Sequence, residues 1–208
     1  MLASQRMHPL LQLDRPGFKV RDIDGTYNPE ETDLKSAIES LTQRAEQAVR
    51  DGATILVLSD RAIARDRLPI HSLLATGAVH HHLIREGLRC DANLIIETAS
   101  ARDSHQIACL LGFGATAIYP YLAYSVLEDL MRSGELLGEP SACYKNYRKG
   151  INKGLLKIMS KMGISAVSSY RGAQLFEAIG LAREVVDLAF RGVASRIEGA
   201  GFVELERE

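Results

Sequence analysis

Three short apolar runs, each followed by a helix-patterned segment, constrain the fold of this chain more than any other feature. Each run is rich in β-branched residues and closes on polar side chains, which is typical of a buried strand and too short for a helix. Strands joined by helices of this length need right-handed crossovers in a parallel sheet. The sequence therefore predicts an α/β fold, a parallel sheet with flanking helices, built on residues 53–60, 92–99 and 115–122.

Further elements are predicted on both sides of these runs. Residues 18–24 alternate apolar and charged side chains, which indicates a first strand nearer the sheet edge. Thr32 or Asp33 can cap a helix that ends at Arg50. The remaining expectations are helices from Pro69, from Asp103 or Ser104, from Leu122 and over 142–162 with interruptions at Gly150 and Gly154, a fifth strand over 163–170, and short helices over 172–179 and 183–190.

Five units of strand and helix are more than half of a (β/α)₈ barrel but not a whole one. A partial TIM-barrel-like architecture leaves an edge strand open. Either the sheet is open and doubly wound, or a neighbouring domain completes it. The expected organisation is a loosely held lead-in over residues 1–16, a single α/β domain over 17–203 and a tail over 204–208.

Composition excludes several classes of protein. A net charge of −1 gives no overall attraction to nucleic acid or to anionic membranes. No apolar stretch approaches the roughly 20 residues that a membrane span requires, and no signal-peptide pattern is present at the N-terminus. The odd number and wide spacing of Cys90, Cys109 and Cys143 fit reduced thiols. We therefore expect a cytoplasmic protein without membrane contact.

Polar side chains at the carboxyl ends of the predicted strands form the candidate site, because ligands collect at that edge of parallel α/β folds. Asp60 and Glu97 could perform acid–base chemistry or hold a metal. In the favoured interpretation they cap the following helices or pair with an arginine such as Arg61, Arg102 or Arg171. The candidate interdomain or ligand contacts are Asp60, Arg61, Glu97, Tyr119, Tyr121, Ser169, Tyr170 and Arg171.

Three consecutive histidines, His80, His81 and His82, invite a metal site. Consecutive helical residues point about 100° apart, however, and cannot converge on one ion as an i, i+4 pair does. We expect His81 to be a hydrogen-bonded core residue, and a metal would need outside ligands such as His105 or Glu97. The sequence therefore predicts no metal site.

Lysines recur every four residues along the helix predicted over 142–162. This basic stripe could meet phosphate, an acidic partner domain or nucleic acid. Little aromatic interleaving is available for base stacking, so a partner surface or a solvated face is favoured over nucleic acid. Motifs of the P-loop, dinucleotide-binding and nucleophile-elbow types are missing from the sequence. The stripe consists of Lys149, Lys153, Lys157 and Lys161.

Four long segments resemble the large (alpha) subunit of glutamate synthase, in the C-terminal part of its central domain. They are residues 74–89, 115–123, 150–165 and 169–181, and the similarity extends over roughly 17–202. The segments occur in order and are far longer than a short motif, so the resemblance is specific.

The resemblance implies a role in an oxidoreductase of nitrogen assimilation and glutamate biosynthesis. The family enzyme hydrolyses glutamine in an amidotransferase domain and passes ammonia through an internal tunnel. It then adds the ammonia reductively to 2-oxoglutarate at a domain that holds FMN and an iron–sulfur cluster. The central domain links the two and has a topology similar to an incomplete FMN barrel. The implied partners are those two domains, with a small subunit as a further candidate.

Departures from the family pattern limit what can be transferred. The family nucleophile is an N-terminal cysteine, whereas this chain begins Met1-Leu-Ala. The iron–sulfur cysteines and FMN-contacting segments belong to a later region of the family enzyme. No catalytic or cofactor-binding residue is therefore assigned, and the chain alone is expected to have neither glutaminase nor synthase activity. Two alternatives remain: a free-standing small-molecule or phosphate-binding domain with phosphate at helix N-termini near 168–172, and, ranked last, a nucleic-acid binder.

Overall fold

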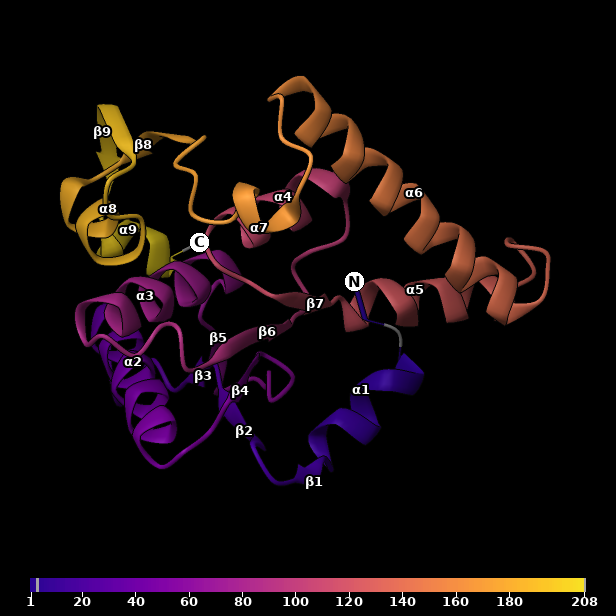
Figure 1. Cartoon of the computed structure of the whole chain (residues 1–208), viewed down its shortest axis with the longest axis horizontal. Helices are drawn as coiled ribbons and strands as arrows, with labels where there is room; N and C mark the ends of the chain where they lie inside the picture. Colours follow the sequence, from indigo (N-terminus) through magenta and orange to yellow (C-terminus); the bar gives the residue numbers. More distant parts are fainter. Residues whose placement is uncertain (3, 208) are drawn as a thin grey trace.

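In the computed structural model, which describes residues 1–2 and 4–207, the predicted apolar runs form a parallel sheet (Figure 1). The strand order within the described chain is β1-β2-β4-β6-β7, in which β1 is antiparallel and the other strands are parallel. The first predicted strand, β2, is followed at the sheet edge by β1, which is only two residues long. The strand bounds are β1 Asp14–Arg15, β2 Phe18–Asp24, β4 Ile55–Ser59, β6 Asn93–Glu97 and β7 Ala117–Tyr119.

Two small sheets and a series of helices surround the main sheet. The strands β3 and β5 pair antiparallel, and β8 and β9 pair parallel near the C-terminus. Their bounds are β3 Thr26–Tyr27, β5 Leu68–Pro69, β8 Glu177–Leu181 and β9 Ala194–Ala200. The helices are α1 Ser4–Leu11, α2 Leu34–Arg50, α3 Ser72–Arg85, α4 Ser104–Gly112, α5 Tyr121–Arg132, α6 Pro140–Lys161, α7 Val167–Tyr170, α8 Arg183–Ala189 and α9 Phe202–Arg207.

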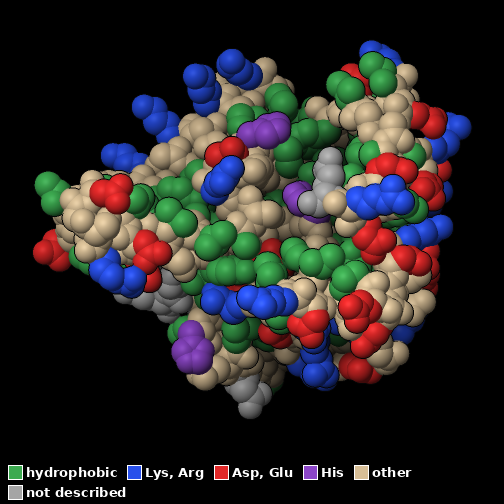
Figure 2. All heavy atoms as spheres, turned by 180° about the vertical axis from the view of Figure 1, so that it is seen from behind, with side chains coloured by type: hydrophobic (Ala, Val, Ile, Leu, Met, Phe, Trp, Pro, Cys, Tyr) green, Lys and Arg blue, Asp and Glu red, His purple; other side chains and the backbone are tan. Residues whose placement is uncertain are grey.

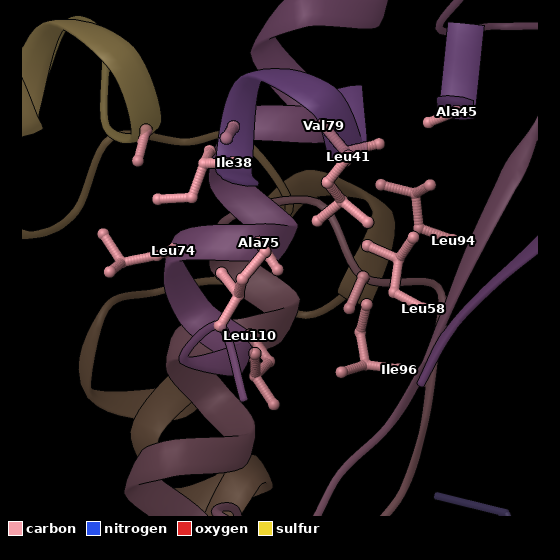
Figure 3. Packing of buried hydrophobic residues seen from close by; sticks show 14 of the residues in the cluster. Ile38, Leu41, Ala45, Leu58, Leu74, Ala75, Val79, Leu94, Ile96 and Leu110 are labelled. Carbon is pink, nitrogen blue, oxygen red and sulfur yellow. The ribbon is translucent and has the colours of Figure 1, made fainter. Parts of the chain in front are cut away.

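The helices that follow β2, β4 and β6 all pack on one face of the sheet. Alternate strand residues, among them Leu58, Leu94 and Ile96, point toward Ile38 and Leu41 of α2 and toward the side chains of α3 and α4 (Figure 3). A doubly wound sheet would carry helices on both faces, whereas a barrel carries them only on the outside. The crossover helices therefore follow the pattern of a partial (β/α) barrel, while α1 and α5 contribute side chains to an apolar cluster on the opposite face.

Residues near the N-terminus cover the opposite, inner face of this half barrel. Met7 of α1 is 3% exposed and lies in one apolar cluster with Val57, Ile95 and Tyr119. The backbone N–H of Leu2 donates to the carbonyl oxygen of Ile118 at 2.8 Å, on the outer edge of β7. Leu2 and Met7 are thus held against the sheet, while the expected division into a lead-in, a domain and a tail stays a prediction.

Local capping explains the helix starts that were predicted correctly. Asp33 accepts a hydrogen bond from the Ser36 N–H at 2.7 Å and begins α2, and Asp103 forms a capping box with Gln106 at the start of α4. The predicted start at Pro69 is wrong. Pro69 pairs with Thr26 between β5 and β3, and α3 begins only at Ser72.

Two predictions in the C-terminal third are wrong. Residues 163–170 do not form a strand but contain the short helix α7, because a strand needs a pairing partner and the free edge of β7 is already bonded by Leu2. Residues 172–179 do not form a helix, since Gly172 (φ 70°) and Gln174 (φ 53°) adopt left-handed backbone angles. The chain then enters β8 instead.

The long helix α6 is continuous through both glycines at which an interruption was predicted. A methyl group at Gly154 would collide with the Ser104 side chain, whereas a methyl group at Gly150 would meet nothing within 4 Å. Gly154 therefore permits the close approach of α6 to α4. No helix among the described residues is long and apolar enough to cross a membrane.

Candidate functional site

The carboxyl ends of β4 and β6 bring Ser59 and Glu97 opposite each other in the sheet. Glu97 is 4% exposed, and its Oε2 accepts a hydrogen bond from the Ser59 hydroxyl at 2.6 Å. Its Oε1 accepts a hydrogen bond from Nε of Arg61 at 2.8 Å. The predicted pairing of Glu97 with Arg61 is confirmed, and both carboxylate oxygens are engaged within the chain.

Asp60 is the second buried carboxylate at this edge. Its Oδ2 accepts from the Thr98 hydroxyl at 2.6 Å, and the backbone N–H of Ala99 donates to both oxygens at 3.0 and 3.1 Å. These bonds tie the loop after β4 to the loop after β6. Asp60 and Glu97 thus satisfy buried donors, and no carboxylate oxygen here is left without a partner. Glu97 pairs with an arginine as expected, whereas Asp60 bonds Thr98 and Ala99 instead of capping a helix or pairing with an arginine.

Arg61 extends from this network toward the molecular surface. Its side chain is 54% exposed, and its guanidinium lies 4.3 Å from the ring centroid of Tyr121 and 5.8 Å from that of Tyr119. Burial, followed by the charge of Asp60, raises the pKa of the Tyr121 phenol, which therefore keeps its proton. The result is a fixed, half-exposed cation held between an aromatic platform and a buried carboxylate.

The remaining three predicted site residues lie elsewhere. Ser169, Tyr170 and Arg171 were placed at the end of a fifth strand, but they belong to α7 and the turn after it. The Gly172 N–H donates to the carbonyl oxygen of Gly112 at 2.8 Å, at the C-terminal end of α4 and so at the opposite edge of the sheet. The structure brings together Asp60, Arg61, Glu97, Tyr119 and Tyr121 only.

This correction also removes the site proposed for phosphate near 168–172. The helix α7 is four residues long and has no side-chain cap, and the segment after it enters a strand. A helix N-terminus binds anions when several free N–H groups and an aligned helix dipole converge. A helix of this length provides little of either.

A cavity of about 780 Å³ adjoins the strand-end residues. Its lining comes from chain segments far apart in sequence, including the β3–β5 region, the start of α3 and the C-terminal helices. No local sequence motif predicts this cavity, because its lining residues Tyr27 and Glu206 come together only in the folded chain. The Tyr27 hydroxyl donates a 3.2 Å hydrogen bond to Glu206. The lining residues used below are Asp60, Ile63, Leu122 and Glu206.

The three histidines diverge, as helical geometry requires. Nδ1 of His80 accepts from Nε of Arg89 at 2.8 Å, whereas Nε2 of His82 lies 2.7 Å from Oε2 of Glu46. The expectation of a hydrogen-bonded core position for His81 is wrong, since His81 is half-buried and lines a second cavity.

His82, Glu46 and Glu86 are close enough together to hold a metal ion. Arg50 already bridges the two carboxylates, at 2.7 Å from Glu46 and 3.3 Å from Glu86. The arginine supplies the positive charge that an ion would bring, so the group is an ion-pair network.

These features define the class of the protein as a partial (β/α) barrel in which the polar side chains at the carboxyl ends of the strands are hydrogen-bonded to one another and to the backbone. The fold is similar to that of a flavocytochrome b2 variant with sulfite bound, with a TM-score of 0.52 and 12% identity. That similarity covers 83% of this chain and 38% of the flavocytochrome chain, and at this identity it concerns the fold alone.

The chain belongs to the glutamate synthase central domain family, whose model matches residues 1–182. It is 44% identical to the ferredoxin-dependent glutamate synthase of Pyropia yezoensis over its full length, and 39% identical to the NADPH glutamate synthase large chain of Bacillus subtilis. The ferredoxin-dependent glutamate synthase 2 of Arabidopsis thaliana is 47% identical over 86% of this chain. The chain spans 12 to 14% of the length of these three relatives.

The residues at the strand ends do not fit a bound FMN. A flavin phosphate needs cationic or N–H donors, but the charged side chains among the described lining of the 780 Å³ cavity include the carboxylates of Asp60 and Glu206 and no Lys or Arg. Arg61, the nearby cation, is already paired with Glu97. The donor chemistry of this edge therefore differs from that of a flavin site.

Proposed function

We propose that this chain is the connecting part of a glutamate synthase large subunit, placed between an amidotransferase domain and an FMN-binding domain. The whole enzyme transfers the amide nitrogen of glutamine to 2-oxoglutarate to form glutamate. In this proposal FMN and the iron–sulfur cluster are held by other parts of the enzyme, and a small subunit is a further candidate partner. The chain itself contributes contacts and no catalytic residue.

The state of the strand-end carboxylates carries this proposal. Asp60 and Glu97 are buried, and their carboxylate oxygens accept hydrogen bonds from donors of the same chain. Neither carboxylate therefore has an oxygen directed at a ligand or at a group with which it could exchange a proton. A catalytic carboxylate needs the opposite, an oxygen directed at a reacting group. Their chemistry supports a structural role at this edge of the sheet.

The surface beside these carboxylates has the character of an interface. Ile63 and Leu122 are 45% and 46% exposed and line the same cavity, and Val126, one turn after Leu122 on α5, is 48% exposed. Figure 2 shows hydrophobic side chains gathered across the middle of one face of the molecule. Exposed apolar groups around an ordered arginine are typical of surfaces that contact another domain.

A chimeric enzyme tests the proposal. This chain replaces the matching segment of the Bacillus subtilis large chain, to which it aligns over its full length at 39% identity. We expect glutamine-dependent glutamate synthesis to be retained. Arg61→Glu should uncouple glutamine hydrolysis from glutamate formation at least about tenfold, because it reverses the exposed charge at the contact and repels Glu97.

Arg15→Glu is the matched control, since Arg15 is exposed on β1, beside the first residue of β2 and so away from the carboxyl ends of the strands, and undergoes the same charge reversal. Equal coupling in Arg61→Glu and Arg15→Glu would contradict a contact role for this edge. Glutaminase activity or stoichiometric FMN binding by the 208-residue chain alone would overturn the proposal as a whole.

A further inference from the structure

A second cavity, of about 390 Å³, lies at the opposite, amino edge of the sheet. It is enclosed by the last turns of α3, the end of α4, the turn after α7 and the loop between α8 and β9. The lining residue His80 is bonded to Arg89, which donates to the carbonyl oxygens of Ala92, directly before β6, and of Gly114, three residues before β7. The cavity therefore lies at the amino ends of these strands. The lining is His80, His81, Ile84, Gly112, Phe113, Gly172, Gln174, Phe176, Arg191, Gly192 and Val193.

The charged groups around this cavity are basic. None of the described lining residues is acidic, and Arg171 directly precedes the lining residue Gly172. Among the residues that the structure describes, neither Arg89, Arg171 nor Arg191 forms an ion pair. Clustered cations without a carboxylate counterpart repel one another, so an anion entering the cavity lowers the energy of the cluster.

The pKa of His80 agrees with an excess of positive charge around this cavity. Burial, followed by the charges of Arg89, His81 and Arg171, lowers this pKa to about 3. The pKa of His81 is also lowered, first by burial and then by Arg85 and Arg191. Every charge that acts on these two imidazoles is positive.

Hydrogen-bond donors are available beside the cavity. Because Nδ1 of His80 accepts from Arg89, the proton of the neutral imidazole resides on Nε2, which can donate to a ligand. Nε of Arg171 is buried and has no hydrogen-bond partner among the described residues. Buried N–H groups are almost always paired in folded proteins, so an unpartnered guanidinium N–H points to a missing acceptor.

The backbone around the cavity is held in a rare conformation. Gln174 is the non-glycine residue with positive φ (53°) in the described chain, a conformation that few non-glycine residues adopt. A Cβ atom at Gly192 would collide with the Gln174 side-chain amide. Phe113 and Phe176, with ring centroids 5.2 Å apart, supply an apolar wall.

We propose that this cavity binds a small organic anion, with its phosphate or carboxylate group against Arg191 and His80 of the lining and close to Arg171, and its apolar part against Phe113 and Phe176. A volume of about 390 Å³ suits a metabolite-sized ligand. The site is built from side chains at the amino edge, so it is independent of the contact role proposed for the carboxyl edge, and either can fail alone.

Histidine-selective NMR of the 208-residue chain tests the site with two probes, phenyl phosphate and benzoate, at constant ionic strength. We expect saturable shifts of the His80 and His81 ring resonances with at least one probe, and the stronger probe identifies the anionic group. Arg191→Gln should weaken binding at least tenfold, whereas Lys35→Gln should leave it unchanged. Arg191 is exposed, so its substitution is not expected to disturb folding, which circular dichroism verifies.

Two results would overturn the proposal. One is the absence of saturable His80 and His81 shifts with both probes up to about 10 mM, beyond which binding of this kind carries little free energy. The other is equal affinity in the wild-type chain and in folded Arg191→Gln. Arg171→Gln provides a second variant, read in the same titration, with the same tenfold loss expected.

Discussion

The two ends of the half barrel differ in whether their charged groups are paired. At the carboxyl edge, each of the two buried carboxylates meets donors of the same chain within 3.1 Å. At the amino edge, basic groups surround a cavity whose described lining contains no acid, and Nε of Arg171 lacks a partner. In (β/α) barrels ligands bind at the carboxyl edge, but here that edge is internally satisfied and the amino edge is not.

The difference has an energetic meaning. A buried polar group that is fully bonded stabilises the fold or leaves it unchanged, whereas an unpaired buried donor costs about 1–3 kcal/mol. The carboxyl edge should therefore be sensitive to mutation through stability. The amino edge should respond mainly through titration and ligand binding, and the four experiments that follow separate these two behaviours.

The largest effect is expected for Asp60→Ala. It leaves the Thr98 hydroxyl and the Ala99 N–H without their acceptor, and two buried donors together should lower the free energy of unfolding by about 3 kcal/mol. Urea denaturation measures this change. The control is Asp129→Ala, which removes an exposed ion pair with Arg132 and should change the free energy of unfolding by less than about 0.5 kcal/mol. Equal losses of stability in the two variants would contradict the different roles assigned to buried and exposed carboxylates.

The helix crossing next to the carboxyl edge should show the next largest effect. Gly154→Ala forces a methyl group against Ser104 at the start of α4, and we expect a loss of about 2 kcal/mol. Gly150→Ala places the same methyl group in open space and should stabilise the helix by about 0.5–1 kcal/mol. Thermal unfolding of both variants compares them, and changes of the same sign would contradict the assigned crossing.

The pH dependence of stability should distinguish the amino edge from the carboxyl edge. The pKa of His80 is about 3 in the folded chain, because of burial and then of neighbouring positive charges, against about 6.5 for an unperturbed histidine. Between these values the unfolded chain binds more protons, so His80 makes stability fall as the pH decreases from about 6.5 toward 3. His80→Gln should flatten this acid limb in urea titrations at several pH values. An unchanged slope would place His80 in a solvated environment.

The smallest stability effect is expected for Arg191→Glu. Arg191 is exposed and unpaired among the described residues, so the free energy of unfolding should change by less than about 0.5 kcal/mol. The pKa of His81, now lowered by burial and by Arg85 and Arg191, should rise, and NMR titration of His81 measures it. A fall in this pKa would show that Arg191 does not face the cavity.

Features set by local sequence were predictable. The runs at 53–60 and 92–99 became β4 and β6, and their parallel pairing brought Asp60, Arg61 and Glu97 together as expected. Asp33 and Asp103 begin helices because a capping side chain acts within three residues. The family resemblance in the four segments also agrees with the family match.

Features that depend on distant partners were not predictable in the same way. Residues 163–170 have the composition of a strand, but Leu2 already bonds the edge that they would have joined. Ser169, Tyr170 and Arg171 were misplaced as a consequence, because their assignment depended on that strand. The two cavities combine residues from separate halves of the chain, and no periodicity in one segment encodes such a meeting.

The bond from Leu2 to Ile118 has a further consequence for the protection of the sheet edge at β7. An unpaired strand edge is a template on which a second chain can extend the sheet. By bonding one edge and laying Met7 over the inner face, the first residues fill in for the strands that a complete barrel would supply. Removal of Leu2 and Met7 is therefore expected to leave the edge of β7 and the inner face of the sheet open to pairing with a second chain.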